Sequence, residues 1–174
     1  MTLLFIGAVI LLLVGLNALY VAAEFAAVSA RRTRVQELAL DGNRLAKRLL
    51  PYVEDRNKLD RYIAACQIGI TLSSLVLGFY AQSRLSPYLS PWLSVPLTTV
   101  VVLVLMTSFQ VVFGELVPKS IAMRYPERWA LLTLTPMTWT VSVLRPLIAF
   151  FNGSAFALMR LLRLKGRGDT LVHS

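Results

Sequence analysis

Long runs of apolar residues dominate the sequence and predict membrane-spanning helices. Residues 3–23 carry no charged side chain, which is enough for one helix to cross a hydrocarbon core of ~30 Å. Two further apolar runs, 62–83 and 92–114, are separated by serines and prolines typical of a turn. With the flanking residues that continue each helix, the predicted spans are about 3–28, 60–83 and 92–117.

Amphipathic segments follow the first and third spans. Residues 30–50 place apolar side chains largely along one side of a helix, opposite charged ones, although the region around Gly42 weakens the pattern. Residues 127–163 are also apolar, but prolines and an Asn-Gly pair interrupt them. We interpret them as short helices at the membrane surface rather than a fourth span. The predicted fold class is an all-α membrane protein with three transmembrane helices and a belt of juxtamembrane amphipathic helices.

The distribution of basic residues predicts how the protein is oriented in the membrane. Residues 30–61 contain nine lysines and arginines, whereas the loop between the second and third spans contains only Arg84. Short cytoplasmic loops collect Lys and Arg. We therefore expect a multi-pass protein of the cell membrane, the inner or plasma membrane of a prokaryote, with the N-terminus outside and the belt on the cytoplasmic side.

The amino-acid composition excludes several classes of functional site. The chain has 174 residues, 56% hydrophobic, and a formal net charge of +9. Because the basic segment directly follows a span, membrane lipids are the expected partner and nucleic acid is not. A single cysteine and a single histidine exclude an intrachain disulfide, a zinc site and a Cys/His nucleophile. We do not expect an enzyme.

Polar residues inside the spans are the candidate functional groups, because they are costly in a bilayer. In the first span, Asn17, Tyr20, Val21 and Glu24 share one helical face. Asn17 fits either hydrogen bonding between helices or ion ligation. Glu24 fits either ligation or the inner end of the span.

The second and third spans carry similar stripes of polar residues. Gln67, Thr71 and Ser74 share a stripe, with Gly69 and Ser73 beside it, and this pattern fits close helix packing or ligation. Gly69 can also expose its backbone carbonyl. In the third span, Thr107, Gln110 and Gly114 share a stripe.

The end of the third span combines a carboxylate with a proline. Pro118 has no N–H, so a helix through it is predicted to kink and to release the carbonyl of Gly114 beside Glu115. Carboxylate and carbonyl oxygens are the ligands of hard cations such as Mg²⁺ or Na⁺. The alternative is that this segment only terminates the helix, with Glu115 paired to Lys119.

Three segments carry a resemblance to a known family. They are NALYVAAEFAAVSARR, QIGITLSSLVLG and FGELVPKSIAMRYPER, in this order along the chain. Together they resemble the transmembrane domain of the CNNM (cyclin M)/CorC family. The resemblance implies three transmembrane helices, an inner belt, a homodimer and Na⁺-coupled Mg²⁺ export. It maps the acidic metal ligand onto Glu115, with the Gly114 carbonyl beside it.

The sequence departs from the family pattern at two places. Where the family often reads G-N-T, this chain has Gly69-Ile70-Thr71, and where many members read S-x-S-E it has Val21-Ala22-Ala23-Glu24. Three explanations for these departures stay open. Backbone carbonyls or water complete the coordination shell of the ion, or Thr71 or Asn17 replaces the missing side-chain ligand. Alternatively, this branch of the family has changed its ion or lost transport. The predicted ion-binding set is Glu115, Gly114, Gly69, Thr71, Val21, Glu24 and Asn17.

Domain organisation follows from the same resemblance. Residues 1–174 are predicted to form a single transmembrane domain, and the chain ends at GRGDTLVHS, where the family continues into a cytosolic CBS-domain pair. The first functional hypothesis is Na⁺-coupled Mg²⁺ export, with Mg²⁺ as the transported ion. The alternative is a non-conducting, membrane-anchored regulatory scaffold.

Overall fold

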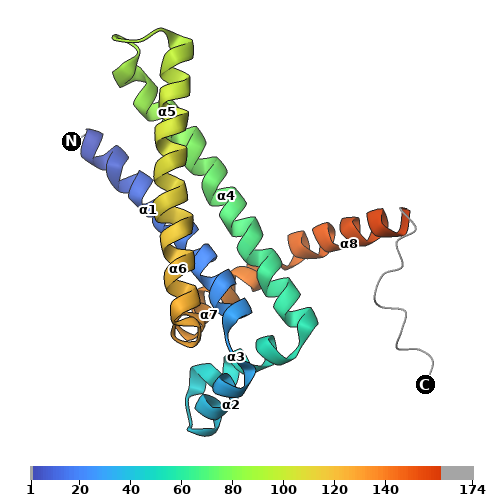
Figure 1. The fold of residues 1–174 in the computed structure, drawn as a ribbon. Coiled ribbons are helices and arrows are strands. Elements are labelled where there is room, and N and C mark those ends of the chain that lie inside the picture. Colours follow the sequence, from blue (N-terminus) through green and yellow to red (C-terminus); the bar gives the residue numbers. More distant parts are fainter. Residues whose placement is uncertain (1, 162–174) are drawn as a thin grey trace.

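The computed structural model describes residues 2–161, and every regular element within them is helical (Figure 1). The elements are α1 (Thr2–Ser29), α2 (Arg32–Leu40), α3 (Arg44–Glu54), α4 (Arg56–Leu89), α5 (Val95–Phe109), η1 (Gln110–Leu116), α6 (Val117–Arg124), α7 (Pro126–Val143) and α8 (Arg145–Leu161). Three helices are long and apolar enough to cross a membrane: Leu3–Ser29, Arg56–Leu89 and Val95–Arg124. The all-α, three-span fold class is confirmed.

The second and third spans are longer than predicted. The predicted turn after residue 83 is wrong, because α4 continues through Pro87 to Leu89. Pro87 lies in the last turn of the helix, so its missing N–H removes only one hydrogen bond at an exposed end. The third span includes α5, η1 and α6 and runs to Arg124 rather than to residue 117.

Helix α1 lies at the centre of the bundle because alanines line two of its sides. Ala22 and Ala26 are buried in one core cluster with residues of α6 and α7, and Ala23 and Ala27 are buried in another with residues of α4 and α7. These pairs have the small-xxx-small spacing that lets helices approach closely in a membrane. The N-terminal half of α1 packs through a third, purely apolar cluster that includes Val14, Leu77 and Val102.

The third span is the most peripheral of the three. Only 11% of its most apolar window is buried inside the chain, against 33% for the second span. Its exposed side chains are large and apolar, among them Leu103, Val104 and Leu105. Such a surface is stable only against lipid or another apolar partner.

The segment predicted as one helix over 30–50 forms two helices, α2 and α3 (Figure 1). The chain reverses at Gly42, which has a φ of 91°, a conformation that glycine adopts without steric cost. Asn43 then caps α3, because its side-chain oxygen accepts hydrogen bonds from the amides of Leu45 (3.0 Å) and Ala46 (3.1 Å). Turn and cap together outweigh the continuous amphipathic pattern.

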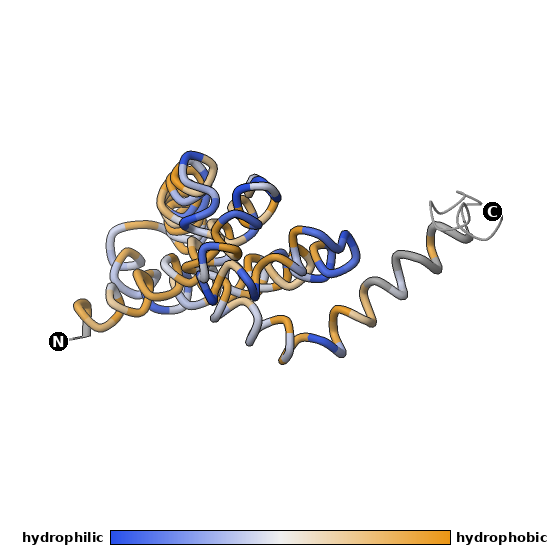
Figure 2. The backbone as a smooth tube through the Cα atoms, turned by 90° about the horizontal axis from the view of Figure 1, so that it is seen from below, coloured by the Kyte–Doolittle hydropathy of each residue, from blue (hydrophilic) through white to orange (hydrophobic). Residues whose placement is uncertain are grey.

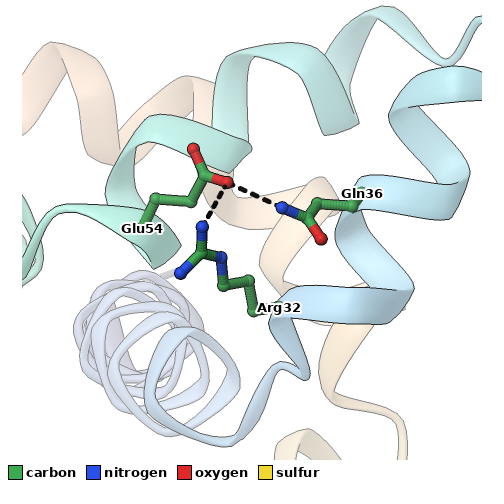
Figure 3. A network of polar contacts seen from close by, with 3 residues as sticks. All are labelled: Arg32, Gln36 and Glu54. Carbon is green, nitrogen blue, oxygen red and sulfur yellow. Dashed lines mark hydrogen bonds and ion pairs between the residues drawn. The ribbon is translucent and has the colours of Figure 1, made fainter.

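Polar contacts hold these short helices at one end of the bundle. Figure 3 shows Glu54 Oε1 accepting hydrogen bonds from Arg32 Nη2 (3.1 Å) and Gln36 Nε2 (2.8 Å), which joins α2 to the end of α3. The backbone N–H of Arg31 donates to Glu127 Oε1 at 3.4 Å, which links the start of α2 to α7. These contacts are exposed, so we expect them to orient the helices more than to stabilise them.

Helices α7 and α8 replace the segment predicted over 127–163, whose residues 162 and 163 lie outside the described part of the chain. Pro126–Val143 and Arg145–Phe151 are long and apolar enough to cross a membrane only when taken together, and the two helices are bent by 70° relative to each other. Helix α8 runs sideways away from the bundle in two perpendicular views (Figures 1 and 2). The side of the membrane on which these helices lie stays a prediction.

Candidate functional site

Asn17 is the centre of a buried polar cluster between the spans. It lies near the middle of α1 and is fully buried. Its Oδ1 accepts hydrogen bonds from the hydroxyls of Ser73 (2.9 Å) and Ser74 (3.2 Å) on α4, and its Nδ2 donates to the carbonyl of Gly114 in η1 at 3.1 Å. One side chain therefore connects all three spans.

The third span contributes a second side chain and a backbone carbonyl to this cluster. Gln110 Nε2 donates to the hydroxyl of Ser74. Gly114 is buried against Asn17, and a Cβ at this position would lie 3.0 Å from Asn17 Nδ2. The absence of a side chain at Gly114 therefore allows the contact between the amide and the carbonyl. We call Asn17, Ser73, Ser74, Gln110 and Gly114 the polar centre.

Around Gly114 the third span widens into a π-helix, Gln110–Leu116. The sequence predicted a kink at Pro118, but Val95–Arg124 continues as one helix with the π-helical segment directly before the proline. Pro118 has no N–H to offer the Gly114 carbonyl four residues earlier, and the Asn17 amide supplies a donor instead. Single π-helical turns inside α-helices occur frequently at functional sites.

The face of α1 predicted from spacing lies against α4. Tyr20 packs on Gly69 so closely that a Cβ there would be 2.6 Å from ring atoms of Tyr20. The carbonyl of Gly69 accepts the Ser73 hydroxyl at 2.8 Å. Val21, the next residue of α1, is buried, and Glu24, one turn beyond Tyr20, is half-buried near Gln67.

Glu115 lies beside the polar centre without belonging to its hydrogen-bond network. It directly follows Gly114 and is half-buried. Among the described residues, its carboxylate has neither a hydrogen bond nor an ion pair. The ion pair between Glu115 and Lys119, which was the alternative prediction, therefore does not form in the structure. The ammonium group of Lys119 instead lies 4.4 Å from the ring centroid of Phe25.

Of the predicted set, the structure brings together Asn17, Gly69 and Gly114, whereas Thr71 lies apart. Thr71 is exposed, and its hydroxyl donates to the Gln67 carbonyl of its own helix at 2.9 Å. The prediction did not include Ser73, Ser74 and Gln110 in the site. The sequence did contain one indication of this face of α4: Gly69 and Ser73 are small residues four positions apart, a spacing typical of helix contacts in membranes.

The groups of the polar centre that could bind a ligand are mainly oxygen atoms. It offers two side-chain amides, two hydroxyls and the Gly114 carbonyl, with the Gly69 carbonyl and the Glu115 carboxylate next to it. Within the described residues, no three His, Cys, Asp or Glu side chains gather closely enough to hold a metal ion. A cation here would therefore be bound by neutral oxygens and at most by one or two carboxylates, a set suited to hard ions.

Fold and site define a three-span α-helical membrane domain whose spans meet at a buried polar centre. The family model "Cyclin M transmembrane N-terminal domain" matches residues 8–174. The chain therefore belongs to the cyclin M (CNNM) transmembrane domain family, as the resemblance predicted.

Several curated proteins are similar over most of the chain. UPF0053 protein YrkA of Bacillus subtilis is 36% identical over 176 residues, which cover 94% of this chain and 39% of that protein. UPF0053 protein YugS of the same species is 33% identical, covering 87% and 37%. A protein named polyamine export protein, from Haemophilus influenzae, is 30% identical, covering 85% and 35%. The chain thus spans less than half the length of these relatives.

Proposed function

We propose that this chain is the membrane domain of a cation exporter that carries Mg²⁺ in exchange for Na⁺. The observation that supports it most is the polar centre, buried where all three spans meet. A single-helix membrane anchor would need no such groups, because each polar atom is costly to place in a bilayer. In this proposal Glu115 and the Gly114 carbonyl are the principal ligands.

Binding would replace hydrogen bonds inside the centre by bonds to the cation. The Gly114 carbonyl is now bonded to Asn17 Nδ2, and rotating this amide by half a turn would present Oδ1 toward the same space. The hydroxyls of Ser73 and Ser74, which now donate to Oδ1, would then face Nδ2 and would have to accept hydrogen bonds from it instead. In this proposal, binding of an ion therefore rearranges contacts that join the spans, which would couple binding to movement of the helices.

Dimerisation and regulation belong to the same proposal. We expect a homodimer, which is compatible with the large exposed apolar surface of the third span. As the family resemblance implies, we also expect cytosolic CBS domains downstream to control the transport cycle.

The test is the thermal stability of the detergent-purified protein as a function of Mg²⁺, Na⁺ and Ca²⁺ concentration. A ligand that binds only the folded state stabilises it by ~2.7 kcal/mol at a concentration of 100 Kd. We expect a Mg²⁺-dependent increase that Glu115→Gln removes. Glu37→Gln is the control, because this glutamate lies in α2, outside the spans, and pairs with Arg34. A well-folded protein without a response to any cation would contradict the proposal and favour a non-conducting scaffold.

A polyamine is a second candidate cargo, suggested by the name of the relative from Haemophilus influenzae. The Glu115 carboxylate and the oxygens of the polar centre are acceptors for ammonium groups as well as ligands for a metal ion. Spermidine in the same titration separates the two cargoes. Stabilisation by spermidine at concentrations where Mg²⁺ has no effect would identify the polyamine.

A further inference from the structure

A groove opens between α3 and α7, outside the polar centre. Its volume is about 620 Å³. It is lined by Arg48 of α3 and by Thr135, Pro136, Thr138, Trp139 and Ser142 of α7. The two helices are held together beneath it by a buried cluster that contains Ala46 and Leu49 of α3 with Ala130 and Leu134 of α7. The walls of the groove are therefore fixed relative to each other.

The α3 side of the groove is basic. The buried side of α3 is apolar, while Arg44, Lys47 and Arg48 are exposed. Of these three, Arg48 lines the groove, and among the described residues it forms no ion pair. A guanidinium group binds phosphate oxygens in a bidentate manner, which gives it a preference for this anion.

The α7 side of the groove combines exposed apolar groups with hydroxyls. Leu132, Thr135, Pro136, Trp139 and Val143 lie on one helical face, and the side chain of Trp139 is 73% exposed. Tryptophan is enriched where membrane and water meet, because its ring is apolar and its N–H is polar. This face thus offers contact to an acyl chain and hydroxyl groups to a headgroup.

We propose that this groove binds one anionic glycerophospholipid. Its phosphate lies on Arg48, a hydroxyl of the α7 wall donates to the headgroup, and one acyl chain lies along Leu132 and Trp139. The occupant must be amphipathic, because a charged wall and an apolar wall face the same space. The groove also lies beside the exposed basic residues of α3, where we expect the headgroups of anionic lipids. This site is independent of the proposed cation transport.

Quenching of Trp139 fluorescence by brominated lipid tests the proposal directly. The protein has three tryptophans, so Trp92→Phe and Trp129→Phe leave Trp139 as the single reporter. The purified protein is titrated in detergent with dibrominated phosphatidylglycerol or dibrominated phosphatidylcholine, which differ in headgroup charge. We expect phosphatidylglycerol to quench at a several-fold lower mole fraction. Equal quenching by the two lipids would overturn the proposal.

Two charge-matched variants separate a site from a diffuse basic surface. Arg48→Gln should reduce the preference for phosphatidylglycerol about fivefold, because it removes the guanidinium group that binds the phosphate oxygens. Lys47→Gln removes the same charge from the neighbouring exposed position, outside the groove, and should change the preference less than twofold. Equal effects of the two variants would overturn the proposal.

Two further measurements complete the test. Millimolar glycerol 3-phosphate should not relieve the quenching, and if it does, the groove binds a soluble phosphate rather than a lipid. Native mass spectrometry of the protein with all its tryptophans provides a second readout that does not depend on the double substitution. Retention of phosphatidylglycerol by the wild type and its loss in Arg48→Gln are expected. Equal retention by both would refute the assignment.

Discussion

Gly69→Ala tests the contact that sets the position of α1 against α4. The substitution adds one methyl group where α4 meets the ring of Tyr20. In the structure, an ideal Cβ at Gly69 lies 2.6 Å from both Cε2 and Cζ of Tyr20, and 2.7 Å from Cδ1. Carbon atoms in favourable contact are ~3.5–4.0 Å apart, so the ring or the helix must move by about 1 Å.

The size of the effect follows from comparison with a second glycine of the same helix. Overpacking of this kind costs ~1–3 kcal/mol. Alanine also favours a helix over glycine by up to ~1 kcal/mol, which offsets part of the loss. Gly78 has no atom within 4 Å of its ideal Cβ, so Gly78→Ala shows the helix preference alone. We expect Gly69→Ala to be less stable than Gly78→Ala by about 1–3 kcal/mol.

Unfolding of the purified protein in mixed micelles, followed by circular dichroism against the fraction of sodium dodecyl sulfate, measures this difference. The steric origin is tested by repeating the comparison in a Tyr20→Ala background, where the added methyl group has no ring to meet. The penalty at Gly69 should then largely disappear. Equal stability of the two glycine variants, or a penalty that persists without Tyr20, would refute the reasoning.

The other predictions concern single residues of the polar centre and the belt. Asn17→Ala removes three hydrogen bonds between spans, which average ~0.6 kcal/mol each in membranes, and should cost ~2 kcal/mol in the same unfolding assay. Thr71→Ala, which removes a bond within one helix, should cost much less, and equal losses would contradict the assignment. Gly42→Ala places a side chain at a φ of 91° and should lower stability by ~1–2 kcal/mol, whereas Gly42→Asn should be milder. A thermal melt that does not distinguish the two Gly42 variants would argue against this turn.

Some parts of the candidate site could be predicted from the sequence because they depend on the periodicity of a single helix. A helical repeat places Asn17, Tyr20 and Glu24 on one face whatever the rest of the fold, and the structure has all three toward α4. The chemistry of Pro118 likewise identified the Gly114 carbonyl as the one in need of another donor. Neither argument contains information about the partner helix.

The partner on α4 depends on how that helix is rotated about its axis. Thr71 and Ser73 are two residues apart and point to different sides of a helix, so only one of them can face Asn17. The contact of Gly69 with Tyr20 selects the side that carries Ser73, and Thr71 is left exposed. This choice arises from packing between residues 49 positions apart, which local periodicity cannot express.

The sequence by itself determined the class of protein, the number of spans and the residues too polar for a simple anchor. These follow from transfer of side chains into a bilayer, which is a property of each segment separately. Only the tertiary structure decided that α2 and α3 are separate helices, that the third span widens before Pro118, and that Arg48 and Trp139 share a groove. The break between α2 and α3 depends on the conformation of Gly42 and the cap at Asn43, which competed with a continuous amphipathic pattern. The polar centre and the groove depend on contacts between distant segments, which local preferences do not specify.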